Sequence, residues 1–265
     1  METEMNIIKD AKRIVVKIGS STLTHENYRM NLRRIEAIAR VLSDFRNAGK
    51  EMVFVSSGAI SAGVAKLGLE KRPKAIEEKQ AVAAVGQSEL MKIYEHFFGL
   101  FGQNVAQILL TRDIMENPVA RKNAENTFAT LLKMGCIPIV NENDSVSFDE
   151  IEFGDNDTLS AYVSVLCHAD ALIILSDIDG LYDSDPRKNP DAKLISTVAK
   201  VDDTILGYAG GAGSNRGTGG LITKLHAAQI VTPEGIPMFI VNGQNPEVLY
   251  DLFEGKHVGT YFMSN

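Results

Sequence analysis

Short β-branched runs alternate with longer helical segments from one end of this 265-residue sequence to the other. Residues 13–18, 52–55, 105–110, 136–140, 171–175 and 238–241 have the length and composition of buried strands. Helical periodicity fills residues 31–48, 77–98 and 123–134, and further helices are expected from residues 158, 221 and 245. Such alternation favours βαβ units with right-handed crossovers. The sequence therefore predicts an α/β protein, a three-layer sandwich with helices on both faces of a central, mostly parallel sheet.

Composition limits the class of protein further. The chain contains no internal repeat, low-complexity tract or linker, so residues 1–265 are expected to form a single domain. A net charge of -7 argues against a nucleic-acid-binding surface, which normally requires a basic face. Cys136 and Cys167 lack zinc-ligand spacing and are expected to be reduced thiols. With no signal peptide and no membrane-spanning run, the expected location is cytoplasmic and away from membranes.

Residues 207–224 form a glycine-rich stretch that runs directly into a helix beginning at Leu221. Glycine lets a loop bring its N–H groups close to a ligand, and a helix N-terminus attracts anions. Thr218, Thr223 and Lys224 add two hydroxyls and a cation. The stretch therefore favours a phosphate cradle, although a surface loop before an ordinary helix has the same glycine content.

Polar side chains follow several of the expected strands. Lys17 lies within the first strand, where it either faces water at an edge or pairs with an anion. Small residues at 56–63 offer a second helix N-terminus, or close helix packing without a ligand. Acids follow at Asp144, Asp155, Asp157 and Asp177. Because ligands bind at the carboxyl ends of parallel strands, these residues are expected to share one site. Separately, small residues between 81 and 86 indicate a helix–helix or subunit contact.

The motifs of several enzyme classes are missing from the sequence. It contains no Walker A sequence, no G-x-G-x-x-G turn after the first strand, no G-x-S-x-G elbow and no histidine pair with metal-ligand spacing. The remaining pattern favours phosphoryl transfer, in which catalysis is mostly positioning and charge stabilisation. Lys17 and Lys224 supply positive charge, and a carboxylate between them would hold them in place. A carboxylate substrate would need no general base, because it is already ionised near pH 7.

Eight short motifs, in order, resemble the amino acid kinase superfamily over nearly the whole chain. They are VKIGSS at 16–21, SSGAISAG at 56–63, AVGQ at 84–87, LTRD at 110–113, VNEND at 140–144, GDND at 154–157, DGLY at 179–182 and GTGGLITK at 217–224. Within that superfamily the chain is most similar to the branch that phosphorylates glutamate. The resemblance implies ATP-dependent phosphorylation of the γ-carboxylate of L-glutamate to L-glutamyl 5-phosphate, the first step of proline biosynthesis.

The resemblance also implies roles for individual residues. Lys17 and Lys224 would steady the transferring phosphoryl group, with Asp157 between them. Glutamate would be bound by Ser57, Asp144 and Asn156. ATP would be bound by Lys17, Ser176, Asp177, Thr218, Gly219, Gly220, Leu221, Ile222, Thr223 and Lys224. Mg²⁺ would travel mainly on the nucleotide phosphates, and no protein ligand for it is assigned. The resemblance further implies a homodimer or homotetramer and feedback inhibition by proline.

Two departures from the family pattern and two alternatives qualify this interpretation. Many bacterial members continue into a C-terminal PUA domain, whereas this sequence ends at Asn265 and is expected to be a kinase domain alone. Ser176 replaces a frequent threonine but keeps the hydroxyl. Acetylglutamate, aspartate and uridylate kinases would share the ATP side, so Ser57, the 141–144 run and Asn156 are what favour glutamate. A catalytically silent amino-acid sensor is disfavoured, because it has no need of two lysines and a glycine-rich cradle.

Overall fold

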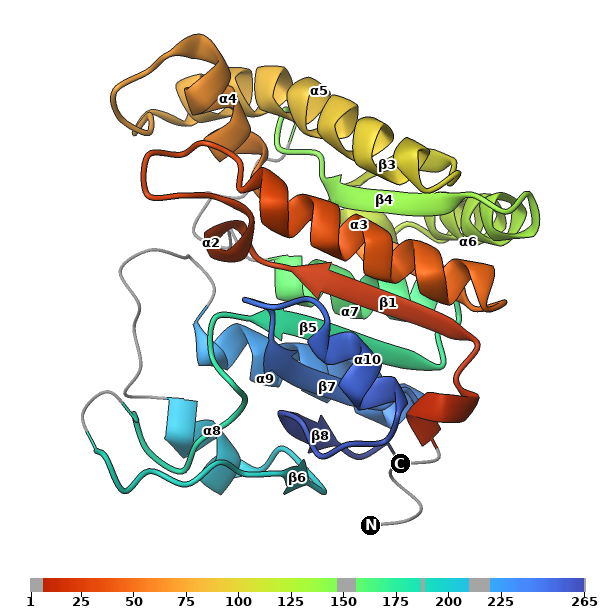
Figure 1. Cartoon of the computed structure of the whole chain (residues 1–265), viewed down its shortest axis with the longest axis vertical. Coiled ribbons are helices and arrows are strands. Elements are labelled where there is room, and N and C mark those ends of the chain that lie inside the picture. The colour runs from red at the N-terminus through yellow and green to blue at the C-terminus, as the bar shows by residue number, and fades with distance from the viewer. Residues whose placement is uncertain (1–6, 147–155, 187–188, 210–219, 265) are drawn as a thin grey trace.

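One eight-stranded sheet runs through the molecule, in the order β3-β4-β2-β1-β5-β7-β8-β6 (Figure 1). This computed structural model describes residues 7–146, 156–186, 189–209 and 220–264. The paired strands are parallel except for β7 and β8, which are antiparallel. The mostly parallel sheet predicted from the sequence is therefore confirmed. The strands are β1 (Arg13–Ile18), β2 (Glu51–Val55), β3 (Val105–Leu110), β4 (Ile137–Glu142), β5 (Ala171–Ser176), β6 (Thr197–Val198), β7 (Met238–Asn242) and β8 (Thr260–Phe262).

Helices cover both faces of this sheet, as Figure 1 shows. One face packs against α3 (Leu32–Asn47), α5 (Ile76–Leu100) and α10 (Val248–Phe253). The opposite face packs against α6 (Pro118–Lys133), α7 (Asn156–Leu166) and α9 (Leu221–Val231). The remaining helical segments are α2 (Ser20–Leu23), α4 (Ala59–Leu67), α8 (Asp203–Ala209), η1 (Arg112–Met115) and η3 (Thr232–Glu234). The three-layer architecture expected from the alternating pattern is present.

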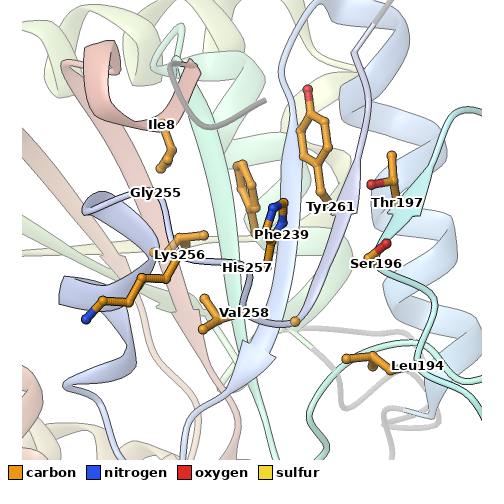
Figure 2. Close-up of a pocket in the computed structure, with 12 residues that line it drawn as sticks. Ile8, Leu194, Ser196, Thr197, Phe239, Gly255, Lys256, His257, Val258 and Tyr261 are labelled. Carbon is orange, nitrogen blue, oxygen red and sulfur yellow. The ribbon is translucent and has the colours of Figure 1, made fainter. Parts of the chain in front are cut away.

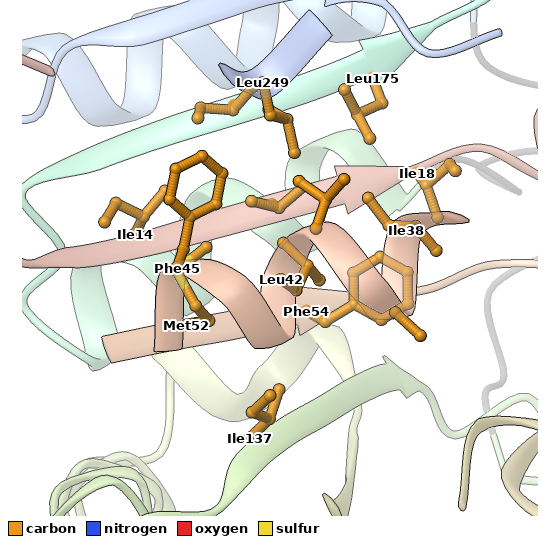
Figure 3. Close-up of a cluster of buried hydrophobic side chains, with 14 of the residues drawn as sticks. Ile14, Ile18, Ile38, Leu42, Phe45, Met52, Phe54, Ile137, Leu175 and Leu249 are labelled. Carbon is orange, nitrogen blue, oxygen red and sulfur yellow. The ribbon is translucent and has the colours of Figure 1, made fainter. Parts of the chain in front are cut away.

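Alternation along β1 assigns its side chains to the two faces. Ile14, Val16 and Ile18 are buried in the core beneath α3, and Figure 3 shows Ile14 and Ile18 there. Val15 is buried in the core beneath α7 and α9. Side chains two residues apart in a strand point to the same face. Lys17 therefore belongs to the face of Val15, the one covered by α7 and α9. The alternation therefore places Lys17, near the carboxyl end of β1, beneath the N-termini of α7 and α9.

The helices α4 and α5 approach each other closely through glycine. A Cβ on Gly86 would lie 1.7 Å from the carbonyl oxygen of Ala59, and a Cβ on Gly63 would lie 2.0 Å from that of Val82. Both distances are far below van der Waals contact, so no larger residue fits without moving backbone. The contact predicted from the small residues between 81 and 86 is a helix–helix contact within this chain.

The structure differs from the sequence-based expectation mainly at element ends. The last helix begins at Val248 rather than at Asn245, because the Asn245 side chain accepts the N–H of Glu247 and caps a turn before the helix. Helix α6 begins at Pro118 instead of residue 123, since Asn117 accepts the N–H groups of the two residues after the proline. The two additional strands, β6 and β8, span two and three residues.

Candidate active site

The carboxylate of Asp157 lies between two lysine ammonium groups. Its Oδ1 is 2.5 Å from Lys17 Nζ, and its Oδ2 is 3.0 Å from Lys224 Nζ. The hydroxyl of Thr223 is also 3.0 Å from Oδ2. The structure therefore joins the three residues that the sequence analysis expected to act together, and it adds Thr223 as a fourth member of the cluster.

Three elements deliver these side chains to one point. Lys17 is the penultimate residue of β1, Asp157 lies in the first turn of α7, and Lys224 lies in the first turn of α9. A carboxylate in the first turn of a helix is stabilised by the helix dipole and the unpaired N–H groups there. Thr223 Oγ1 is also 2.7 Å from the carbonyl oxygen of Gly220, which connects the start of α9 to the cluster.

Burial makes this charge arrangement unusual. Asp157 is 0 % exposed, Lys17 2 % and Lys224 7 %. Taken by themselves, the two ammonium groups and the one carboxylate sum to a net charge of +1 when all three are ionised. Buried charges are costly unless they are paired, and an excess of positive charge in a low-dielectric site attracts an anion strongly. The cluster is therefore suited to stabilising negative charge on a bound group.

Asn156, directly before Asp157, connects the ends of two strands. Its Nδ2 donates to the carbonyl oxygen of Ser56, after β2, and to Asn141 Oδ1 at 2.7 Å, within β4. These two bonds occupy the amide nitrogen and leave Oδ1 as the atom that can face a ligand. The expected acceptor-binding residue Asn156 thus offers a hydrogen-bond acceptor next to the lysine cluster.

Ser57 lies where β2 leads into α4. The next residue, Gly58, has φ +100°, a left-handed conformation that favours glycine, and it occupies the N-cap position of α4 without any side-chain cap. An uncapped helix start leaves N–H groups unpaired by the helix itself. Ser57 and the start of α4 therefore combine a hydroxyl with N–H donors at the carboxyl end of β2.

Asp144 lies just beyond the end of β4 in an environment that disfavours its ionised form. The pKa of this carboxyl is raised to about 7, mainly by burial and also by the nearby charge of Glu142, while the charge of Arg72 acts in the opposite direction. A carboxyl with such a pKa changes charge near neutral pH. The arrival of a cation beside it would favour the ionised form.

On the other side of the lysine cluster, Ser176 is the last residue of β5 and Asp177 follows it. Their side chains are in contact, with Ser176 Oγ 3.3 Å from Asp177 Oδ1. Strand β5 is the direct neighbour of β1, with Leu175 beside Ile18, so both residues lie at the same edge of the sheet as Lys17.

The N-terminus of α9 faces the same region. Gly220 is its N-cap and has no side-chain cap, Leu221 is half-buried, and Ile222 is exposed. Two of the expected ATP-binding residues, Thr218 and Gly219, lie outside the described residues, as does Asp155 of the expected acidic set.

A pocket on the opposite face of the sheet contains none of these residues. It lies on the α10 face of the sheet, where Phe239 and Tyr261 stack with ring centroids 5.0 Å apart, and His257 and Val258 form part of its wall (Figure 2). Separately, none of the helices in the described part of the chain is both long and apolar enough to span a bilayer.

The sequence analysis did not identify two residues of helix α5 that contact the hydrogen-bond partners of Asn156. Tyr94 contacts Ser56 and Gln87 contacts Asn141, across separations of 38 and 54 residues. Gln87 lies within the AVGQ motif at 84–87, but the motif does not indicate which residue the Gln87 side chain contacts. Tyr94 had no local signal, because an aromatic residue at helical spacing is usually a core residue.

The fold and the lysine–carboxylate cluster together define a phosphotransferase of the amino acid kinase type. The sequence model of the amino acid kinase family matches residues 12–242, and the chain belongs to this family. A protein of Clostridium perfringens named glutamate 5-kinase is 60% identical over 261 residues, which is 97% of each chain. A glutamate 5-kinase of Clostridium tetani is 57% identical over 255 residues, or 96% of each chain.

A solved structure shares the fold at lower identity. The UMP kinase of Bacillus anthracis aligns with a TM-score of 0.64 and 18% identity, covering 96% of this chain and 97% of the other. Similarity at this level supports the fold alone.

Proposed function

We propose that this protein phosphorylates the γ-carboxylate of L-glutamate with ATP, yielding L-glutamyl 5-phosphate and ADP. This reaction is the first step of proline biosynthesis. The observation that carries the proposal is the buried Asp157 carboxylate held between the ammonium groups of Lys17 and Lys224. The relatives named glutamate 5-kinase, with identities of 60% and 57%, support glutamate as the acceptor.

The lysines act on the charge of the transferring group. An oxygen of the glutamate carboxylate forms a bond to the γ-phosphorus, while the bond from that phosphorus to the oxygen bridging toward the β-phosphate breaks, and ADP leaves with the electron pair. Negative charge is spread over the phosphoryl oxygens in the transition state. Lys17 and Lys224 stabilise that charge, and Asp157 keeps them at a fixed separation before substrate arrives, which avoids reorganisation during the reaction.

The reaction requires no proton transfer to activate the acceptor. The side chain of glutamate has a reference pKa of about 4.3 and is ionised near neutral pH. A site dominated by cations and N–H donors, without a histidine in the cluster, suits such an acceptor.

The acceptor side of the site suits an amino acid. Asp144 and the Oδ1 of Asn156 are hydrogen-bond acceptors that fit the α-ammonium group of glutamate. Ser57 and the uncapped N-terminus of α4 offer donors that fit a carboxylate. In this proposal the three predicted residues recognise both charged groups at the α-carbon and leave the γ-carboxylate directed at Lys17 and Lys224.

ATP and Mg²⁺ complete the proposal. The uncapped N-terminus of α9 and the cations beside it suit the nucleotide phosphates, and Ser176 and Asp177 lie at the neighbouring strand end. Mg²⁺ retains few protein ligands when it accompanies a nucleotide, so we assign it to the phosphates. The family resemblance alone supports Thr218 and Gly219 as further contacts of the nucleotide.

The remaining expectations are part of the same proposal. One continuous sheet supports a single domain over residues 1–265. Both cysteines are free, which suits a reducing cytoplasm. Proline as a feedback inhibitor and a homodimer or homotetramer rest on the family resemblance.

An ATP-dependent hydroxamate assay tests the function. Hydroxylamine traps an acyl phosphate, so the purified protein is incubated with ATP, Mg²⁺, hydroxylamine and one of L-glutamate, L-aspartate or N-acetyl-L-glutamate. We expect trapped product with glutamate only. Product with another acceptor only, or glutamate binding without any ATP consumption, would overturn the proposal in favour of a different kinase or of a sensor.

A further inference from the structure

Two polar side chains on one face of α5 reach the ends of two different strands. Gln87 Oε1 accepts a hydrogen bond from Asn141 Nδ2 at 2.8 Å, and the Tyr94 hydroxyl is 2.6 Å from Ser56 Oγ. Residues seven apart in a helix lie on the same face, about 10 Å apart along the axis. A single rigid helix thus holds β4 at one position and the end of β2 at another.

Asn156 closes these contacts into a ring. Its Nδ2 donates to both Asn141 Oδ1 and the carbonyl oxygen of Ser56. The ring therefore runs from α5 through Tyr94, Ser56, Asn156, Asn141 and Gln87 back to α5. Each member is fixed by two neighbours, so the orientation of the Asn156 amide depends on residues that do not touch it.

The direction of the Tyr94 hydrogen bond follows from the proton count at Ser56. The Ser56 hydroxyl has one proton, which it donates to the carbonyl oxygen of Ser57 at 3.0 Å. Tyr94 is therefore the donor to Ser56 Oγ. Burial raises the pKa of Tyr94, which keeps its proton in place, and Phe54 packs edge-on against its ring at 5.4 Å and 88°.

We propose that Gln87 and Tyr94 are positioning residues that set the affinity for the phosphoryl acceptor by orienting Asn156 and Ser57 through this ring. The inference deepens the proposed function and rests on it for the identity of the acceptor. Loss of either α5 contact frees one side of the ring. Loss of the Gln87 acceptor leaves the amide nitrogen of Asn141 without that partner, and loss of the Tyr94 donor leaves Ser56 Oγ with only its bond to the Ser57 carbonyl oxygen. Asn156 can then rotate and present its nitrogen in place of Oδ1.

The lysine–carboxylate cluster shares one element with the ring, helix α7, but the ring bonds act on the side chain of Asn156 and not on that of Asp157. Lys17, Asp157 and Lys224 belong to β1, α7 and α9, and α5 makes none of the hydrogen bonds described for them. Opening the ring is therefore expected to weaken acceptor binding selectively.

Steady-state kinetics of Tyr94→Phe and Gln87→Met test the proposal, because each variant keeps the approximate size of the side chain and removes one hydrogen bond of the ring. Gln87→Met also removes an exposed 3.3 Å hydrogen bond from Gln87 Nε2 to Gln107 Oε1, which lies outside the ring. Each is expected to raise the KM for glutamate about fivefold, the scale of one net hydrogen bond, with kcat and the KM for ATP within about twofold of wild type. The double variant, with both substitutions, tests whether the two contacts belong to one connected ring or act independently. Residues this far apart are normally additive, so a ring predicts an increase clearly below the product of the single effects.

Phe98→Leu is the matched control, because Phe98 is buried beside Tyr94 on the same helix and carries no hydroxyl. It is expected to lower thermal stability without changing the KM for glutamate. An unchanged acceptor KM in both Tyr94→Phe and Gln87→Met would overturn the inference. So would an equal rise in the KM values for glutamate and ATP, or a rise in Phe98→Leu that matches theirs. If wild type instead uses another acceptor, the proposed function fails, and the same comparison is made with the KM of that acceptor.

Discussion

Asn156 and Asp157 are consecutive residues at the start of α7, yet their side chains join two different clusters. Asn156 bonds to the ends of β2 and β4, and Asp157 bonds to lysines from β1 and α9. The first turn of one helix therefore connects the proposed acceptor side with the phosphoryl-transfer cluster. This arrangement fixes the two groups relative to each other through one peptide bond.

Replacement of Asp157 by asparagine is expected to destabilise the protein more than replacement of Lys17 by methionine. Asp157→Asn removes the carboxylate that both buried ammonium groups share, a change of about 3–5 kcal/mol for a broken buried pair. Lys17→Met leaves the carboxylate paired with Lys224 and Thr223. Urea unfolding of both variants measures the difference, and an equal or reversed order would contradict the bridging role of Asp157.

Replacement of Asp144 by alanine is expected to act on the acceptor alone. The variant loses a charge-assisted contact with the ammonium group, so the KM for glutamate should rise about tenfold or more while the KM for ATP stays nearly constant. Initial-rate measurements with each substrate varied in turn provide the comparison. A matching loss of ATP affinity would indicate a folding role for Asp144 instead.

The pKa of Asp144 predicts a pH dependence for acceptor binding. With a pKa of about 7 in the free protein, the carboxyl is mostly ionised at about pH 8 and mostly protonated at about pH 6. Only the ionised form pairs with an ammonium group, so the KM for glutamate should rise about tenfold over this interval as the pH falls. Neither charged group at the α-carbon of glutamate titrates there.

Asp144→Asn provides the control for that pH profile. Its side chain has a similar shape and no titrating proton, so its KM for glutamate should be high and nearly independent of pH. A variant that retains the wild-type pH dependence would show that a different group causes it.

Gly86 and Gly99, both on α5, provide a test of the close packing between α4 and α5. Gly86→Ala places a methyl group 1.7 Å from the Ala59 carbonyl oxygen and is expected to cost about 3 kcal/mol or more. Gly99→Ala, on the same helix, meets nothing within 4 Å and should stabilise the protein by up to about 1 kcal/mol. Thermal unfolding of both variants measures the contrast, which fails if Gly86→Ala is as stable as wild type.

The sequence predicted the main elements of the fold because their signals are local. Buried β-branched runs and helical periodicity identified six strands and both helix layers. The ends of elements were less predictable, since Asn245 caps a turn instead of the helix that follows. Strands β6 and β8 span two and three residues, too few for a period to appear, and depend on pairing with β7 and with each other.

The candidate site was predictable to the extent that its residues carry chemistry in short motifs. An anion partner for Lys17 was one of two predicted outcomes, and Asp157 is that partner. The hydrogen bonds of Gln87 and Tyr94 join positions 54 and 38 residues apart, so they depend on tertiary packing. No local pattern contains that information.

The most direct test of the central claim is the turnover of Lys224→Ala at saturating glutamate and ATP. Lys224 contributes one of the two preorganised cations of the cluster, and removal of one such group typically lowers kcat by about 10²-fold or more. The rate of ATP-dependent glutamyl hydroxamate formation measures this, with Lys256→Ala, an exposed lysine beyond α10, as the control that should keep the wild-type rate. A folded Lys224→Ala protein with near-normal kcat would contradict the account.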